Sequence, residues 1–340
     1  MTVMTHDVPK SDRILEVGHA FRASKTLLTA VELGVFTALA DGPLDVEALS
    51  KRAGLHERGA RDFLDALVAL GMLLRDESGN YANSVETDLY LDRNKQTYVG
   101  GLLERFSAEQ YGLWTSLTAA IRTGMPQCNK SMVSHFASLY ADEATRERYV
   151  SAMTAKTRPV AKALAAAFPW ANYGTFIDVG ASQGCLAVEI ALAHPHITGG
   201  GFDLPQLAPL FDDYVQEHAL SDRLRFYPGT FFNDPLPPAE VLVIGRVLHN
   251  WDLATKMMLL EKAYDALPAA GTLIVYEQLI DDERRVNAAG LLSSLQMLLA
   301  SSGGFDFTGA DCIGWMRGVG FRDIRVEPLT ADQSMVLGIK

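Results

Sequence analysis

The most informative stretch of this 340-residue chain is Asp178-Val179-Gly180-Ala181-Ser182-Gln183-Gly184. It follows the short apolar run 175–179 and precedes the apolar segment 185–193, which reads as a helix that His194-Pro195 ends. A strand, a glycine-containing loop and a helix in this order begin a parallel α/β unit. Glycine lets the backbone approach a ligand closely, and the helix N-terminus offers unpaired N–H groups. With only two glycines, the loop is not the dinucleotide-binding fingerprint.

The next strand of this unit ends in a carboxylate. The strand runs into Phe202 and ends at Asp203, 19 residues after Gly184. A carboxylate at this place can accept hydrogen bonds from both hydroxyls of a ribose. Alone, the loop is equally consistent with a plain tight turn, and Asp203 with a strand-end cap. Together, at this spacing, they favour a nucleoside-containing ligand.

Strands and helices continue to alternate through residues 169–340. Further strands are expected at 223–226, 241–244 and 273–276, and a closing antiparallel pair at 324–326 and 335–339. This alternation predicts an α/β domain with a doubly wound, mostly parallel, Rossmann-like sheet.

A histidine follows the fourth of these strands, in the segment 245–252. Ligands of a doubly wound sheet lie beyond the carboxyl ends of its strands, so His249 is expected at the functional edge. By itself, a lone histidine is more often a hydrogen-bonded packing residue. Asp252 is expected to cap the helix that runs to Leu267.

The first 100 residues have the pattern of a helical, winged-helix-like domain. An apolar helix ends near Gly42-Pro43, Asp45 caps a short helix, and Arg58 to Leu70 form a second helix before a hairpin around 77–80. Residues 101–168 are predicted to be a helical linker that contributes to the substrate pocket, with an interruption at 123–126.

Charge and composition exclude several classes of function. The chain has 41 acidic and 30 basic residues and a net charge of −11, which disfavours nucleic-acid binding. The possible recognition helix 57–70 is itself not basic, so a winged-helix transcription regulator is the less favoured alternative. No apolar run approaches the length of a membrane span, and three widely spaced cysteines suit neither a disulfide framework nor a zinc site. A cytoplasmic protein is expected.

With these motifs in place, the chain resembles the two-domain S-adenosylmethionine-dependent small-molecule O-methyltransferases, which include caffeate and acetylserotonin methyltransferases and bacterial antibiotic-tailoring enzymes of secondary metabolism. The resemblance rests on Phe202-Asp203-Leu204-Pro205, Gly229-Thr230-Phe231-Phe232 and Leu248-His249-Asn250-Trp251, in order and at family spacing. It implies a class I methyltransferase fold with an N-terminal dimerisation domain. It also implies a homodimer through the N-terminal helices, a small aromatic acceptor and no metal.

The resemblance also assigns roles to individual residues. His249 is implied to be the general base, with Glu277 and Asp311 at positions that orient it. Tyr149, Met153 and Met297 match substrate-side positions. The implied residues of the S-adenosylmethionine site are Asp178, Gly180, Ser182, Gly184, Asp203, Leu204, Gly229, Thr230, Phe231 and Arg246.

The expected reaction is methyl transfer to a hydroxyl of a small aromatic or polyketide-like molecule. Thr230 and Asn250 stand where many relatives carry Asp. These departures keep open N- or C-methylation, or a non-methylating reaction that retains the cofactor. The pair Gly303-Gly304 reads as a helix end or as a mobile segment near the pocket. The identity of the acceptor does not follow from these patterns.

Overall fold

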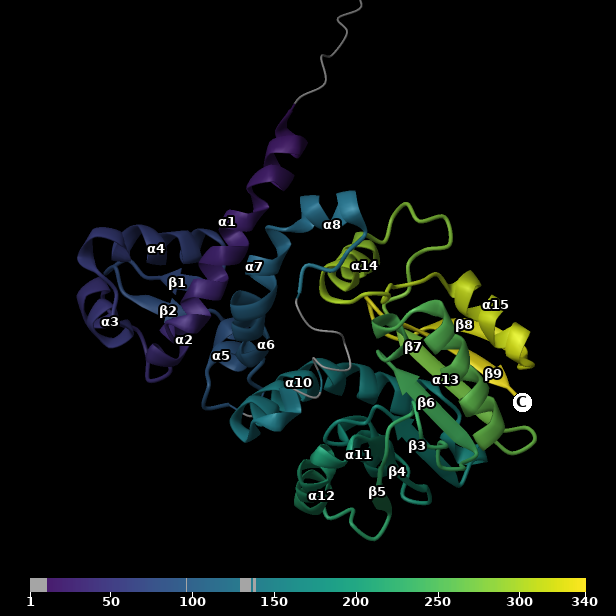
Figure 1. Cartoon of the computed structure of the whole chain (residues 1–340). Coiled ribbons are helices and arrows are strands. Elements are labelled where there is room, and N and C mark those ends of the chain that lie inside the picture. Colours follow the sequence, from purple (N-terminus) through teal and green to yellow (C-terminus); the bar gives the residue numbers. More distant parts are fainter. Residues whose placement is uncertain (1–10, 96, 129–135, 137–138) are drawn as a thin grey trace, which may run out of the picture. The chain divides into compact units, whose positions relative to one another are not determined.

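The structure is a computed structural model that describes residues 11–95, 97–128, 136 and 139–340 (Figure 1). The chain divides into two compact units, Met1–Tyr111 and Gly112–Lys340. This division falls inside the stretch 101–168 that was predicted to be a linker. Residues 129–135 and 137–138 of that stretch lie outside the described part of the chain. The predicted boundaries at 100 and 168 stay a prediction.

The first unit has the predicted winged-helix order of two helices and a hairpin. Asp45 caps the first of these helices and accepts a hydrogen bond from the Ala48 amide at 2.8 Å, and Gly54 ends that helix in the left-handed conformation. The predicted apolar helix is interrupted at Gly34. This residue has a left-handed φ of +70°, and a second helix begins after it. The elements are α1 (Asp12–Glu32), α2 (Val35–Ala38), α3 (Val46–Ala53), α4 (Glu57–Ala69), β1 (Leu73–Arg75), β2 (Tyr81–Asn83), α5 (Val85–Leu91), α6 (Gly100–Arg105) and the π-helix η1 (Phe106–Gln110).

One face of α1 is apolar and exposed. Ile14, Val17 and Phe21 are 75%, 62% and 56% exposed, and their spacing places them on one side of the helix. The C-terminal end of α1, from Leu28 to Val31, is buried in the core of the unit.

The second unit is built on a seven-stranded sheet in the order β5-β4-β3-β6-β7-β9-β8. β9 pairs antiparallel with both of its neighbours, and the other neighbouring pairs are parallel. The predicted mostly parallel sheet and its closing antiparallel pair are therefore confirmed. The strands are β3 (Thr175–Val179), β4 (Thr198–Asp203), β5 (Leu224–Pro228), β6 (Val241–Gly245), β7 (Thr272–Glu277), β8 (Arg322–Pro328) and β9 (Ser334–Ile339).

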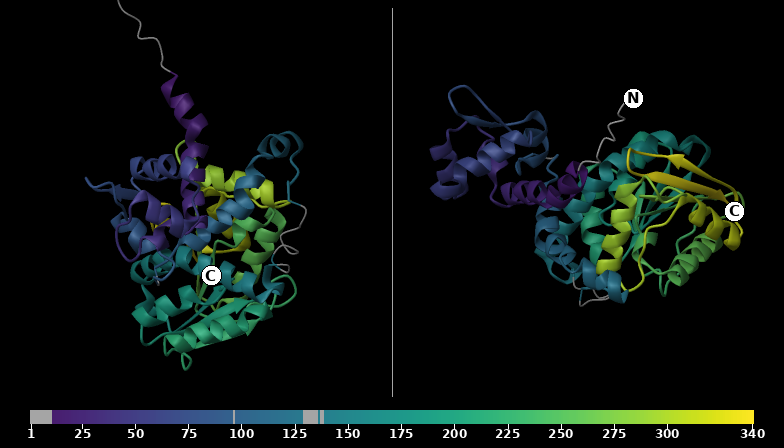
Figure 2. Two further views of the ribbon diagram at one scale, coloured as in Figure 1. Left: turned by 90° about the vertical axis from the view of Figure 1, so that its left-hand side faces the viewer. Right: turned by 90° about the horizontal axis from the view of Figure 1, so that it is seen from above.

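Helices cover both faces of this sheet (Figures 1 and 2). In β6, Val241 and Val243 belong to the core under α10, α11 and α12, whereas Leu242 and Ile244 belong to the core under α13 and α15. Such alternation follows from the two-residue period of a strand that is buried on both faces. The covering helices are α10 (Glu143–Ala167), α11 (Cys185–Ala193), α12 (Ala208–Glu217), α13 (Leu253–Ala266) and α15 (Gly309–Val319).

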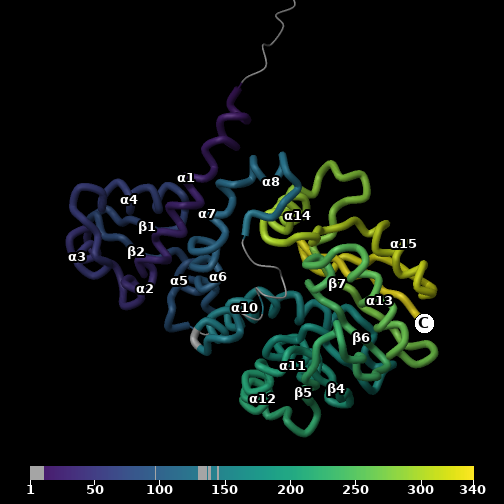
Figure 3. The backbone as a smooth tube through the Cα atoms, in the orientation of Figure 1, coloured from purple at the N-terminus to yellow at the C-terminus, as the bar shows by residue number. Residues whose placement is uncertain are grey.

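Of the remaining helices, α7 and α8 come before α10 in the chain and α14 lies between β7 and α15, whereas three short 3₁₀ helices lie between α10 and α13 (Figure 3). The predicted interruption at 123–126 is present, because Gly124 ends a helix in the left-handed conformation. Trp114 Nε1 donates to Gln296 Oε1 at 2.6 Å. Within the described residues, no helix combines the length and apolarity needed to cross a bilayer. These elements are α7 (Tyr111–Trp114), α8 (Leu117–Thr123), α14 (Ala288–Ala300) and the 3₁₀ helices η2 (Trp170–Asn172), η3 (Pro205–Leu207) and η4 (Leu248–Asn250).

Candidate active site

The predicted site residues gather at the carboxyl edge of the sheet. In the strand register, Val179 of β3 pairs with both Phe202 of β4 and Ile244 of β6. The segments that follow these three strands therefore start at the same level. They carry the glycine loop, Asp203 and Arg246, and β7 ends alongside them at Glu277.

The glycines of the loop are required by close packing. Gly180 has φ of +83°, and a Cβ there would lie 2.6 Å from a methyl of Val247. Gly184 has φ of +89°, and its Cβ would lie 2.5 Å from the ring of Phe211. Neither position accepts a side chain without strain. Ser182 keeps a buried hydroxyl with no hydrogen-bond partner among the described residues.

Two carboxylates at this end of the sheet lack a positive partner. Asp203 accepts hydrogen bonds from the amides of Ser182 at 2.8 Å and Leu204 at 2.7 Å. Removal from water raises the pKa of Asp203 to about 6, against the effect of those two amides. Burial, and then the charge of Asp203, raise the pKa of Asp178 to about 8. Within the described chain, no Lys, Arg or His forms an ion pair with either carboxylate, so this half of the site suits a cationic ligand.

Arg246 adds a donor to this half of the site. It follows β6 with φ of +56°, and its amide donates to the Tyr276 carbonyl at 3.0 Å. Its Nη1 is buried and has no hydrogen-bond partner in the part of the chain that the structure describes. Asn250 holds this turn by donating from Nδ2 to the carbonyls of Arg246 at 3.2 Å and Val247 at 3.3 Å. The side-chain amide of Asn250 therefore has a structural use that a carboxylate cannot supply.

The segment after β5 brings aromatic side chains to the edge. The Phe231 and Trp251 rings lie 5.6 Å apart between centroids, and those of Phe232 and Trp251 lie 5.0 Å apart. Thr230 serves the local turn, because its amide donates to Asp234 Oδ2 at 2.8 Å and its hydroxyl accepts from the Phe232 amide at 3.4 Å. Trp251 Nε1 is buried without a partner in the described residues. An aromatic wall with a free indole donor suits a heteroaromatic ring.

His249 lies in η4 between two carboxylates. Its side chain is 10% exposed, and Nδ1 lies 3.3 Å from Asp306 Oδ1. Its backbone amide donates to Glu277 Oε1 at 3.3 Å. Burial and the nearby Asp306 raise the pKa of Glu277, while His249 and Arg246 oppose that shift. Because Nδ1 faces Asp306, Nε2 is the ring nitrogen that remains for an acceptor.

Asp306, rather than the predicted Asp311, is the carboxylate beside the imidazole. Asp311 is exposed and forms a capping box with Thr308, in which each side chain accepts from the other residue's amide at 3.0 Å. Its carboxylate is engaged by the N-terminus of α15, so the expectation that it orients His249 is wrong. Asp306 was missed because it stands in an irregular segment, where an acid reads as a solvated loop residue.

The glycine pair before Asp306 lets this segment pack on the histidine segment. A Cβ on Gly304 would lie 2.8 Å from the His249 carbonyl oxygen, and one on Gly303 would lie 2.7 Å from Asp252 Cβ. Close backbone packing therefore explains these glycines, in place of the suggested mobile segment.

The histidine and its two carboxylates also have metal-ligand geometry. One donor atom from each of His249, Glu277 and Asp306 lies within 4.8 Å of the others. The fully buried Lys256 supplies a positive charge to the same carboxylates, and that charge disfavours a divalent cation. The absence of a metal stays a prediction.

The predicted substrate residues lie on two helices next to this edge. Gln183 Nε2 of the glycine loop donates to Thr154 Oγ1 of α10 at 2.6 Å, which brings α10 beside the loop, and Met153 is the neighbour of Thr154. Tyr149, one turn earlier, packs on Tyr140 with ring centroids 5.9 Å apart. Met297 lies on α14, which contacts η4. The roles of the three residues toward a substrate stay predictions.

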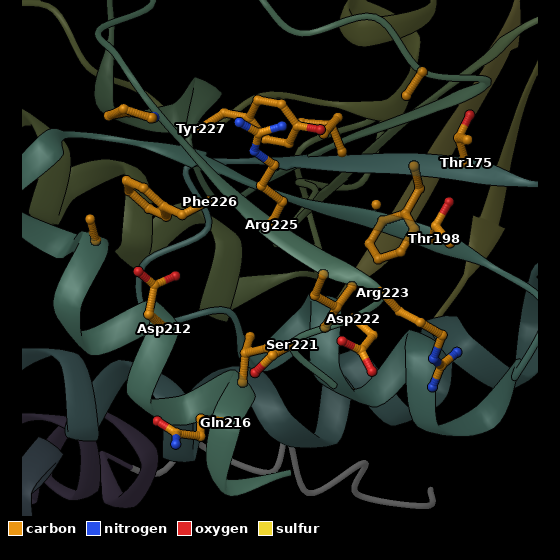
Figure 4. Close-up of a pocket in the computed structure, with 18 of the residues that line it drawn as sticks. Thr175, Thr198, Asp212, Gln216, Ser221, Asp222, Arg223, Arg225, Phe226 and Tyr227 are labelled. Carbon is orange, nitrogen blue, oxygen red and sulfur yellow. The ribbon is translucent and has the colours of Figure 1, made fainter. Parts of the chain in front are cut away.

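A separate pocket of about 720 Å³ runs along the edge strand β5 (Figure 4). It is lined by Asp212 and Gln216 of α12 and by Arg223 and Arg225, and it contains none of the predicted site residues. Arg223 has a structural role, because its Nη1 donates hydrogen bonds to the carbonyls of His194 and Pro195 at 3.1 Å. This pocket is therefore distinct from the site at the carboxyl edge.

Comparison with known families agrees with this geometry. Residues 114–322 match the O-methyltransferase domain family, and residues 15–93 match the O-methyltransferase dimerisation domain. The chain therefore belongs to the O-methyltransferase family. The predicted family, fold class and enzyme class are confirmed.

Individual relatives span the whole chain. The tetracenomycin polyketide synthesis 8-O-methyl transferase TcmO of Streptomyces glaucescens is 41% identical over 100% of this chain and 99% of its own. The N,N-dimethyltransferase OxyT of Streptomyces rimosus is 37% identical over 81% of this chain and 80% of its own. The crystal structure of human N-acetylserotonin methyltransferase in complex with SAM has a TM-score of 0.89 and 28% identity over 99% of both chains. The ligand of that human enzyme agrees with the predicted cofactor.

Proposed function

We propose that this protein transfers a methyl group from S-adenosylmethionine to a hydroxyl of a small aromatic, polyketide-like molecule, with His249 as the general base. The observation that carries the proposal is the His249 imidazole, whose Nδ1 lies 3.3 Å from Asp306 at the edge that holds the glycine loop. The 41% identity to TcmO over the full length supports the acceptor class.

The residues of the carboxyl edge fit S-adenosylmethionine, a cation that carries a ribose, an adenine and an amino acid. Asp203 is placed to accept the ribose hydroxyls, and the carboxyl groups of Asp178 and Asp203, whose pKa values burial raises, suit the positive groups because a nearby cation favours their ionised forms. The unpartnered Nη1 of Arg246 and hydroxyl of Ser182 suit a carboxylate. The aromatic wall at Phe231 and Trp251 suits the adenine.

The cofactor supplies an electrophilic methyl group on a sulfonium. A phenol has a pKa near ~10 and is a poor nucleophile while neutral, so removal of its proton is the task left to the protein. His249 takes that proton on Nε2 while the oxygen–carbon bond forms, which contributes about 10²–10⁴-fold to the rate. Asp306, whose Oδ1 lies 3.3 Å from Nδ1, is placed to favour the tautomer with its proton on Nδ1 and to stabilise the imidazolium, as a carboxylate does in other histidine-based sites.

The proposal is tested with His249→Gln and with hydroxylated naphthoates and anthraquinones as acceptors. Formation of S-adenosylhomocysteine is expected to fall about 10²–10⁴-fold. The affinity for S-adenosylmethionine, measured by calorimetry, is expected to stay within about twofold, because His249 lies outside the group of residues that fits the cofactor. Unchanged turnover in this variant refutes the role of His249.

N-methylation is the second candidate, because OxyT is named as an N,N-dimethyltransferase. A neutral amine attacks without a strong base, so an N-methylating enzyme is expected to keep most of its turnover after His249→Gln. Matched acceptors that differ only in a hydroxyl or an amino group separate the two reactions. Asn250 in place of Asp was one reason to consider a reaction without methyl transfer. Because Asn250 holds the turn at Arg246, its presence has a structural explanation and no longer supports that alternative.

The active protein is proposed to be a homodimer formed through the N-terminal helices. The match to the dimerisation domain and the exposed apolar face of α1 support this assembly. Light scattering at micromolar concentration is expected to give twice the chain mass, and Phe21→Asp is expected to lower it. A wild-type monomer at that concentration contradicts the assembly.

A further inference from the structure

A buried lysine connects the two segments that carry His249 and Asp306. Lys256, in the first turns of α13, is 0% exposed. Its Nζ donates to the Trp251 carbonyl at 2.6 Å and to the Phe305 carbonyl at 3.0 Å. The first carbonyl lies two residues after His249, and the second directly precedes Asp306. One ammonium group therefore bridges both segments.

Aromatic rings complete the surroundings of this ammonium. Nζ lies 3.2 Å from the centroid of the Phe305 ring, 5.5 Å from that of Phe307 and 6.0 Å from that of Trp315. Such rings stabilise a desolvated cation, and two of its three N–H donors are used by the carbonyls. In the described residues, Lys256 forms no ion pair within 4.0 Å, so backbone and rings hold it in place.

The charged groups that face Lys256 come from three places. Glu277 ends β7, Asp306 precedes α15, and Asp252 begins the lysine's own helix. Burial lowers the pKa of Lys256 to about 8, and the three acids oppose that shift. At pH 7 the Lys256 side chain is therefore mostly a cation beside Glu277 and Asp306.

We propose that Lys256 is a positioning residue for methyl transfer, which holds the His249 segment against the Asp306 segment and so sets the contact between Nδ1 and the carboxylate. This inference rests on the proposed role of His249 as the base. Asp306 lies in an irregular segment, where its amide donates to Ser294 Oγ at 3.3 Å. The hydrogen bond from Lys256 to the carbonyl of Phe305, the residue before Asp306, connects this segment to the segment of His249.

The test variant is Lys256→Met, which keeps the length and apolar stem and removes the charge and the donors. The value of kcat is expected to fall about 10–100-fold, while the Kd for S-adenosylmethionine stays within about twofold. The acidic limb of the kcat–pH profile is expected to move to higher pH, because loss of the cation raises the pKa of Glu277 further. Lys256→Gln, which keeps a donor without the charge, is expected to show the same shift with a smaller loss of kcat.

Lys340→Met is the matched control. Nζ of Lys340 also donates to backbone carbonyls, those of Tyr264 at 2.6 Å and Leu267 at 2.8 Å, at the opposite end of α13. Its loss is expected to lower thermal stability without moving the pH profile. If Lys256→Met only lowers stability, as this control does, Lys256 is a structural lysine and the proposal is overturned.

A parallel His249→Gln assay separates failure of this inference from failure of the proposed function. Wild-type turnover in His249→Gln overturns the general base, and with it the positioning role. Loss of turnover in His249→Gln, together with a wild-type kcat and pH profile in Lys256→Met, overturns the positioning role alone. If neither Lys256 variant folds, Lys256→Arg is used, which keeps the charge but cannot reproduce the ammonium contacts with the two carbonyls; a wild-type kcat in that variant also overturns the positioning role.

Discussion

The two halves of the carboxyl edge of the sheet differ in whether their buried acidic side chains have a positively charged neighbour. On the β3–β4 side, Asp178 and Asp203 have no positive partner within ion-pair distance among the described residues, and the pKa of each is raised. On the β6–β7 side, Glu277 and Asp306 lie beside His249 and face the buried Lys256.

The β3–β4 half of the edge receives its positive charge from a ligand, whereas the β6–β7 half contains a positive charge of its own. An unpaired buried carboxylate is costly, so the β3–β4 side is stabilised by a cation that arrives with the ligand. The β6–β7 side already contains a cation, because Lys256 faces Glu277 and Asp306.

The largest expected effect distinguishes Asp306 from Asp311, the acid that was predicted to orient His249. Asp306→Asn is expected to lower kcat about 10²–10⁴-fold, because an amide neither stabilises the imidazolium nor selects the same tautomer. Asp311→Asn is expected to keep kcat within about twofold and to cost about 1 kcal/mol of stability through the α15 cap. Steady-state kinetics and thermal unfolding of both variants check this, and an equal loss of kcat in both contradicts the assignment.

The next effect concerns affinity on the β3–β4 side. Asp203→Asn removes the charge from the bonds proposed to the ribose hydroxyls, and the loss of one such bond, about 1.5–3 kcal/mol, is expected to raise the Kd for S-adenosylmethionine roughly 10–100-fold. Asp212→Asn, an exposed acid in the β5 pocket, is the control and is expected to leave the Kd unchanged. Calorimetry measures both, and a Kd for Asp203→Asn within twofold of wild type shows that Asp203 does not hold the cofactor.

The smallest effect appears in the stability of the protein without ligand. The pKa of Asp178 is raised to about 8, so its neutral form stabilises the fold at low pH, and that stability is lost as pH rises toward about 8. One such group gives a slope of up to ~1.4 kcal/mol per pH unit. Asp178→Asn is expected to flatten the fall of Tm between pH 6 and 8, and saturating S-adenosylmethionine is expected to flatten it in the wild type. Parallel Tm curves for variant and wild type contradict the raised pKa of Asp178.

The sequence predicted the parts of the site that follow regular strands. Asp203 and Glu277 end strands, the glycine loop follows β3 and His249 lies shortly after β6, and parallel strands bring such positions to one edge. Asp306 and Lys256 escaped prediction because their contacts join segments far apart in the chain, and neither spacing nor periodicity encodes such contacts. In the first unit, the break at Gly34 was missed because the apolar pattern continues through it.

The place of β9 between β7 and β8 has a consequence for biosynthesis. The strand that carries Glu277 gains its outer neighbour only when residues 334–339 have left the ribosome. The strands β5, β4, β3 and β6 pair with one another through residues that are synthesised much earlier. During translation, the β5-β4-β3-β6 part of the sheet is therefore able to assemble first, and the β7-β9-β8 edge is completed last.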